Sequence, residues 1–191
     1  MNKYPYSPFN NASQKFISNT LWWSGAFTIV LMIALHVIDK ALATPDGTGG
    51  MIGFELAKNI NHTVAMMTQW KEHGRIMAGL SLGIDYLYMV SYALFLGLLS
   101  FTIGKKLFSR NHFLSKPGFW FSWLMFIAAL LDSTENYALI RILGGDHEQL
   151  WASISYYAAS TKFIIVLLTL LYILLGLAVL WFTKSAKKQP A

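Results

Sequence analysis

The sequence predicts an all-α integral membrane protein. We expect a four-helix transmembrane bundle running up-down-up-down, with both termini in the cytoplasm and one amphipathic helix on the outer side. The 191 residues are 55% hydrophobic and only 13% charged, about half the charge of an ordinary soluble domain. Basic residues gather in three short segments that hold no acid. Four apolar stretches reach the roughly 20 residues that a helix needs to cross the hydrocarbon core, and they cover residues 21–42, 76–103, 118–142 and 153–182.

The basic segments predict the orientation in the membrane. Short segments rich in Lys and Arg stay on the cytoplasmic side. We therefore expect the N-terminus, the second loop and the C-terminus inside, the first and third loops outside, and a plasma (inner) membrane location. The net charge of +6 then reflects topology, so the expected partner is the lipid bilayer and not a nucleic acid. The charges in question are Lys3, Lys15, Lys105, Lys106, Arg110, Lys116, Lys184, Lys187 and Lys188.

The first span follows a polar cytoplasmic tail, residues 1–18. Trp22 and Trp23 suit an interfacial anchor near its start. Ala41-Leu42-Ala43 has the small-x-small form of a signal-peptide cleavage site. The apolar run before it exceeds the roughly 7 to 15 residues of a signal core, so we interpret this span as an uncleaved anchor. The Pro- and Gly-rich residues 45–50 then predict a loop.

An amphipathic helix is predicted over residues 52–70, between the first and second spans. Lysine, asparagine and glutamate side chains lie off its apolar stripe. We expect the apolar face to cap the outer end of the bundle or to lie on the membrane surface. That face consists of Leu56, Ile60, Val64, Met67 and Trp70.

The remaining connections are short. The second loop is predicted over residues 104–117, where Pro117 suits the first turn of the third span. The third loop lies around Gly144 and Gly145. Short loops join antiparallel neighbours. We expect one membrane domain over residues 19–183, followed by a basic cytoplasmic tail, 184–191.

Ionisable residues within the spans fall at one depth. Counting 1.5 Å per residue from the inner interface places them roughly 22 to 31 Å up, in the outer part of the membrane. A charged side chain facing lipid costs at least ~2.5 kcal/mol at the bilayer centre. We therefore expect these side chains to face the bundle interior. They are His36, Asp39, Asp85, Asp132, Glu135 and Lys162, and every span supplies at least one.

Helical spacing places further polar groups on the same faces. Asp132 and Glu135 are three residues apart on the third span, with Asn136 beside them, and Ser155 and Lys162 are seven apart on the fourth. We expect Asp132 or Glu135 to exchange a proton, with Lys162 as the charge partner. The residues expected to bind a ligand are His36, Asp39, Asp85, Tyr88, Tyr92, Asn136 and Ser155.

Several chemistries are excluded or disfavoured. The absence of cysteine excludes disulfides, zinc–thiolate sites, iron–sulfur clusters and thiol catalysis. His36-x-x-Asp39 and Asp132-x-x-Glu135 superficially resemble the ligand spacing of di-iron bundles, but Glu-x-x-His is absent and the fourth span offers a lysine. No second histidine within a span could complete a haem site. The chain contains no phosphate-binding loop or nucleophile elbow. We expect no metal and no cofactor.

Four carboxylates against one lysine and one histidine leave an excess of negative charge, which needs a proton, a cation or a cationic ligand. The first hypothesis is therefore an outer-leaflet polar cavity that binds a small amphipathic or cationic ligand, with a lipid among the candidates and acid–base chemistry left open. The alternative is a non-catalytic accessory or scaffold subunit of a membrane complex, or a homo-oligomer, whose polar layer serves helix packing. A proton-coupled transporter is a weaker alternative, because the inner half of the bundle has no ionisable relay. Such a transporter would need an oligomer. Whether the protein is an enzyme stays undecided at this point.

Overall fold

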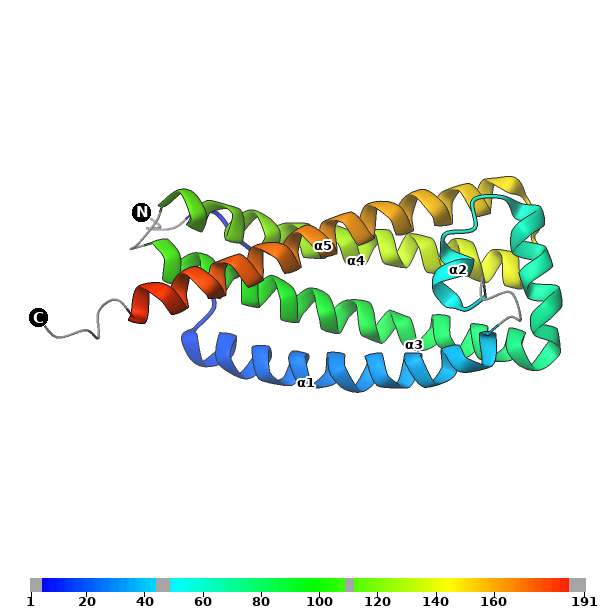
Figure 1. Ribbon diagram of the computed structural model, residues 1–191, viewed down its shortest axis with the longest axis horizontal. Helices are drawn as coiled ribbons and strands as arrows, with labels where there is room; N and C mark the ends of the chain where they lie inside the picture. The colour runs from blue at the N-terminus through cyan, green and yellow to red at the C-terminus, as the bar shows by residue number, and fades with distance from the viewer. Residues whose placement is uncertain (1–4, 44–48, 109–111, 186–191) are drawn as a thin grey trace, which may run out of the picture.

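The protein is a bundle of long helices. The computed structural model describes residues 5–43, 49–108 and 112–185, and every regular element within these ranges is a helix. Four of the helices are long and apolar enough to cross a membrane, which indicates a membrane protein. Figure 1 shows them side by side, with the start of the first and the end of the last at the same end of the bundle.

The helices are longer than the predicted spans, because each continues beyond its apolar part. Ser13 begins the first of them, since its Oγ accepts a hydrogen bond from the backbone N–H of Phe16 at 3.2 Å. In chain order the elements are α1 (Gln14–Asp39), the 3₁₀ turn η1 (Lys40–Leu42), α2 (Met51–Glu55), α3 (Ile60–Phe108), α4 (His112–Leu143) and α5 (Gln149–Ser185).

The single amphipathic helix predicted over residues 52–70 is wrong in its continuity. Residues 51–55 form the separate helix α2, and α3 begins at Ile60. Asn59 causes the restart, because its side-chain oxygen accepts the backbone N–H of Asn61 at 2.9 Å and so caps the new helix. The buried face also differs from the predicted stripe. It includes Thr63 and Met66, while Leu56 is exposed.

A kink at Lys71 divides α3 into a short first part, residues 60–70, and a long second part. Lys71 has φ 56° and ψ −166°, a conformation that is costly for any residue with a side chain. Its neighbour Trp70 is buried and donates its indole N–H to the carbonyl oxygen of Leu42 at 2.8 Å. Trp70 also packs edge-on against Phe54, with ring centroids 5.0 Å apart. These contacts hold the first part of α3, residues 60–70, across the end of the bundle (Figure 1).

The second loop is much shorter than predicted. Helix α3 continues to Phe108 and α4 begins at His112, so residues 109–111 are all that separates them. Pro117 lies inside α4, not at its start. Residues 112–116, which precede Pro117, are therefore helical. At the end of α3, Lys105 and Lys106 lie in the last turn, where they interact favourably with the helix dipole.

Part of the predicted N-terminal tail packs onto the bundle. Phe9 is 7% exposed and its ring lies 5.8 Å from that of Phe101 and 5.9 Å from that of Phe126. The hydroxyl groups of Ser7 and Ser122 are hydrogen-bonded at 2.8 Å. Residues 7–9 therefore close one end of the bundle. Most of the loop predicted over residues 45–50 and most of the tail predicted over 184–191 lie outside the described residues.

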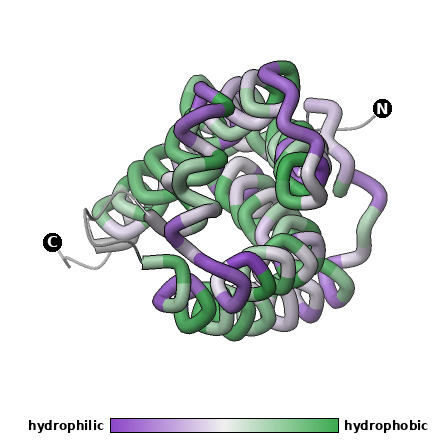
Figure 2. Tube along the Cα trace, turned by 90° about the vertical axis from the view of Figure 1, so that its right-hand side faces the viewer, coloured by the Kyte–Doolittle hydropathy of each residue, from purple (hydrophilic) through white to green (hydrophobic). Residues whose placement is uncertain are grey.

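Helix α3 lies at the centre of the packing, with α1, α4 and α5 against it. Hydroxyl groups join α1 to α3: the Thr28 and Ser91 hydroxyls lie 2.7 Å apart, and Ser91 Oγ donates to the carbonyl of Ser24 at 3.0 Å. Figure 2 looks along the bundle from the end that carries α2, and shows hydrophobic helices behind a more hydrophilic near end. Helix α1 packs chiefly on α3, so the space between α1 and α5 is available for the site.

Candidate functional site

Lys162 of α5 lies at the centre of a buried ionic group. Its ammonium nitrogen is 2.8 Å from Asp132 Oδ1, 2.8 Å from Glu135 Oε2 and 3.7 Å from Glu55 Oε2. The lysine is 6% exposed, Asp132 2% and Glu135 0%. Helices α2, α4 and α5 thus contribute to one cluster. Burying charges is costly unless they are paired, which explains why one ammonium is surrounded by carboxylates.

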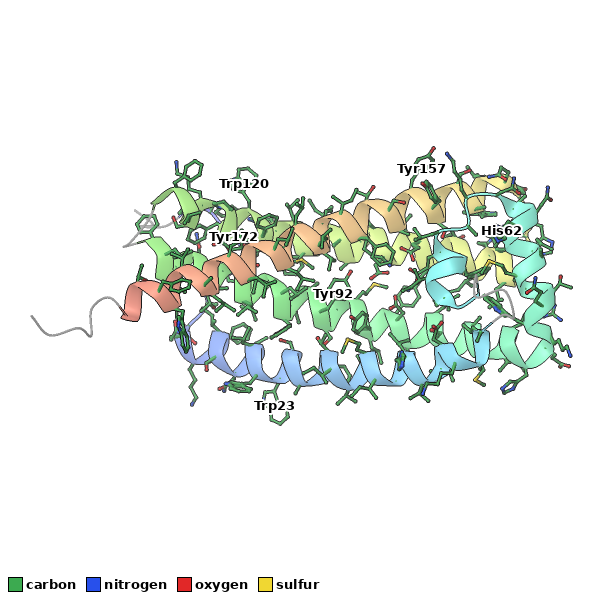
Figure 3. The ribbon with its side chains drawn as sticks, viewed as in Figure 1. Trp23, His62, Tyr92, Trp120, Tyr157 and Tyr172 are labelled. Carbon is green, nitrogen blue, oxygen red and sulfur yellow. The ribbon has the colours of Figure 1, made fainter. Side chains whose placement is uncertain are left out.

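Asp132 is the best-satisfied acid of the group. Tyr92 of α3 donates its hydroxyl hydrogen to Asp132 Oδ2 at 2.8 Å, while Lys162 donates to Oδ1 at 2.8 Å. Each carboxylate oxygen therefore has its own donor. Figure 3 shows Tyr92 within the bundle, whereas Trp23 and Tyr157 point outward.

Glu135 is held differently from Asp132. Its Oε2 forms the ion pair with Lys162 but lacks hydrogen-bond geometry, and its Oε1 has no hydrogen-bond partner among the described residues. Glu135 is also absent from the lining of the cavity described below. It therefore lies behind Lys162, where it balances charge without reaching the open space.

Glu55 was not predicted as a site residue, because the sequence pattern placed it on the amphipathic helix predicted over residues 52–70. It ends α2, and Ser155 of α5 anchors that end by donating its hydroxyl to the Glu55 carbonyl oxygen at 3.1 Å. Burial raises the pKa of the Glu55 carboxyl above its ordinary value, and the charge of Lys162 opposes this shift. One signal was available: an acid directly after Phe54 in the apolar run of residues 51–56.

Asp39 holds the start of α2 in place. Its Oδ1 accepts the backbone N–H of Met51 at 2.6 Å, as an acidic cap does. Gly50 has φ 94°, and a β-carbon there would lie 3.1 Å from Asp39 Oδ1. Glycine is thus required by both the backbone conformation and the close approach. Asp39 and Ser155 fix the two ends of α2, and α2 carries Glu55 into the bundle.

Asp85 forms a second polar contact beside the ionic group. Its Oδ2 accepts the side-chain amide of Asn136 at 2.7 Å. Asn136 is a neutral donor, so this hydrogen bond supplies no balancing charge to Asp85. Tyr88 lies next to it, with its ring 5.3 Å from that of Tyr92.

These side chains border a cavity of about 490 Å³, a volume typical of small-molecule sites. Its polar wall is formed by α1, α2, α3, α4 and α5 together, and its apolar wall by α1, α2, α3 and α5. The polar lining includes His36, Asp39, Glu55, Ser81, Asp85, Tyr88, Tyr92, Asp132, Asn136 and Lys162. The apolar lining includes Met32, Leu35, Ile52, Leu82, Phe95, Leu96, Phe163, Val166 and Leu170.

The structure therefore brings most of the predicted site residues to one cavity. Glu135 and Ser155 are the two that stand outside the lining, the first behind Lys162 and the second against the backbone of α2. His36 is exposed at the edge. Within the described ranges, no three His, Asp or Glu side chains are arranged to hold a metal ion, and the ammonium of Lys162 occupies the position between the carboxylates.

In comparisons with known proteins, no protein-family model, no curated protein and no solved structure matches the chain. The geometry of the site is therefore the basis for inferring a function.

Proposed function

We propose that this protein binds a small amphipathic molecule, with its polar group among Asp85, Asp132 and Lys162 and its apolar part between α1 and α5. One observation carries the proposal: a cavity of about 490 Å³ whose lining is ionic at one end and apolar at the other. Ligand sites commonly combine a mostly apolar wall with a few convergent polar groups.

The length of the apolar part supports an alkyl or polycyclic tail. On α1 the lining runs from Asp39 back to Thr28, and on α5 from Lys162 to Leu170. At 1.5 Å per residue these stretches measure roughly 16 Å and roughly 12 Å. The polar end lies toward α2, which contributes Glu55 to the lining. A ligand held this way would lie parallel to α1 and α5, as the lipids of the surrounding leaflet do.

Sideways entry from the bilayer fits the exposure of the lining. Met32 on α1 is 50% exposed and Phe163 on α5 is 37% exposed, although both line the cavity. In a membrane this outer surface is covered by acyl chains. An amphipathic molecule could pass between α1 and α5 without leaving the hydrocarbon phase, so no aqueous entrance is required.

For the orientation, we propose that the bundle crosses the membrane up-down-up-down with both termini cytoplasmic, which places the cavity in the outer leaflet of a plasma (inner) membrane. The support is the segregation of Lys and Arg described above. Reporter fusions at Lys188 and at Gly145 should report opposite sides, with Lys188 inside. The same side for both would contradict the proposed topology.

Acid–base chemistry on the bound polar group would fall to Asp132 rather than to Glu135. Asp132 lines the cavity and Glu135 does not. Tyr92 and Lys162 hold the Asp132 carboxylate in one position, as proton transfer requires. Glu135 would act as a positioning residue through its ion pair with Lys162.

Ligand binding can be tested by filling the apolar end. Val166 lines the cavity, whereas its neighbour Leu167 is 58% exposed and does not. We expect the wild-type protein to co-purify with an amphiphile. The Val166→Trp variant should lose this amphiphile, because the indole occupies the space of the tail. Leu167→Trp is the matched control and should retain it. The measurement is mass spectrometry of extracts from protein purified in mild detergent, together with a thermal melt of each variant.

Equal recovery of amphiphile from the two tryptophan variants would contradict the proposal. If Val166→Trp fails to fold, Leu170→Trp introduces the same side chain at another lining position and gives the same comparison. Recovery of a stoichiometric protein partner, with no amphiphile, would instead favour the accessory-subunit alternative.

A further inference from the structure

We infer that the polar group of the bound molecule is a cation, such as a protonated amine. This inference depends on the proposed function, because it specifies the ligand class of the same cavity. Its support is the set of charged groups that face the cavity, the ion pairs that these groups already form, and the carboxyl groups that stay outside those pairs.

The ionisable groups around the cavity are predominantly acidic. Asp39, Glu55, Asp85 and Asp132 line it, and Glu135 stands directly behind. Against these five carboxyl groups the described part of the lining offers the ammonium of Lys162 and the imidazole of His36. An anionic polar group would therefore meet repulsion from most of the wall. A cation would meet attraction at short range, in surroundings where charges are weakly screened.

Lys162 cannot balance the remaining acids, because it is already engaged. Its ammonium lies 2.8 Å from both Asp132 and Glu135. Glu55 is 3.7 Å away, which is too far for a strong hydrogen bond. Glu55 is nevertheless only 9% exposed and lines the cavity. Burial disfavours the charged form of this carboxyl, and a ligand ammonium beside it would stabilise that form.

Asp85 supplies the second acceptor. Asn136 donates to its Oδ2, while its Oδ1 accepts no hydrogen bond from the described residues. Asp85 also lies outside the ion pairs of Lys162. Its charge can therefore be removed while the central ionic group keeps all its members. That separation makes Asp85 the position at which cation binding can be tested.

The experiment uses a matched pair of probes, dodecylamine and dodecanol, each carrying a photoreactive diazirine in the tail. The protein is placed in nanodiscs of phosphatidylcholine, which carries no net charge, and labelling is followed by mass spectrometry. Alkyl amines have an ordinary pKa of roughly 10, so the amine is charged at neutral pH. We expect half-saturation at a concentration at least about tenfold lower for the amine, the effect of one charge-assisted hydrogen bond. Both adducts should fall on α1 and α5.

The Asp85→Asn variant should remove most of this preference while the alcohol still labels. The control is Glu72→Gln, which removes one acid at an exposed position of α3 outside the cavity and should keep the preference. Because the result is a ratio of two probes on one protein, partial misfolding lowers both signals and leaves the ratio interpretable.

The outcomes separate the two claims. Equal saturable labelling by amine and alcohol would overturn the cation assignment and leave the amphiphile cavity standing. An unchanged preference for the amine in the double variant Asp85→Asn, Glu55→Gln would also overturn the cation assignment. If neither probe labels α1 or α5 saturably, the proposed function fails and the cation assignment fails with it.

Discussion

Replacing Lys162 by Met should destabilise the protein by about 3 to 5 kcal/mol, the range for removing one partner of a buried ion pair. Methionine preserves the length and most of the volume of the side chain, so the principal change is the loss of the charge. Asp132, Glu135 and Glu55 would then face one another with no ammonium between them. The first two are almost fully buried, and water cannot readily screen their repulsion.

The effect is measured as the free energy of unfolding in detergent, followed by circular dichroism. Lys106→Met is the matched control, because Lys106 is an exposed lysine of the same chain and its loss should change stability by only a few tenths of a kcal/mol. Combining Lys162→Met with Glu135→Gln should recover part of the loss, since the double variant carries one unbalanced acid fewer. The corresponding cycle with Asp132→Asn tests the second pair.

Coupling near zero in both cycles would show that the three residues do not share one site, and the cavity proposal would lose its central ionic group. Binding of the co-purified amphiphile should be measured on the same variants. Full binding by the Lys162→Met, Glu135→Gln double variant would mean that this ion pair serves packing alone.

Replacing Gly118 by Val should destabilise the bundle by about 1 to 3 kcal/mol or more, the usual cost of overpacking. A β-carbon at Gly118 would lie 2.7 Å from the carbonyl oxygen of Ser100 and 2.9 Å from the Cα of Gly104. Both are backbone atoms of α3, so neither can rotate away. Helices α3 and α4 would have to separate at this contact. Small residues permit such approach between membrane helices.

Gly83→Val is the control for this substitution. Gly83 lies in the same long helix α3, and a β-carbon there would have no neighbour within 4 Å. Both variants place a β-branched residue in a helix, so the difference between their melting temperatures isolates the steric effect at the crossing. Equal melting temperatures would contradict the close packing of Gly104 and Gly118.

The hydropathy of the chain was sufficient to predict four long helices. Each apolar stretch is continuous in sequence, and a continuous stretch in lipid must satisfy its backbone hydrogen bonds internally as a helix. The helix ends were predicted less well. At Asn59 a local side-chain cap divides what periodicity joined. Near Pro117 the helix begins earlier than predicted, although a proline inside a helix removes one hydrogen bond and crowds the preceding turn.

Part of the site could also be anticipated from the sequence. Asp132 and Glu135 share a helix face by spacing alone, and a helix-rise count places Lys162 at a similar depth. The rotation of each helix about its axis decides whether such groups meet, and side-chain packing across the bundle determines it. Sequence spacing therefore indicated the depth of Asp85, but its pairing with Asn136 depends on how α3 and α4 pack.

By itself, the sequence determined the membrane class, the number of long helices and the shared level of Asp132, Glu135 and Lys162 along the bundle, because length, hydropathy and spacing are local properties. Only the tertiary structure decided that α2 re-enters the bundle. Asp39 and Ser155 hold its two ends, and Glu55 thereby reaches the ion group of Lys162. The tertiary structure likewise decided that a cavity lies between α1 and α5. Both features depend on contacts between residues far apart in the chain, and no local pattern records them.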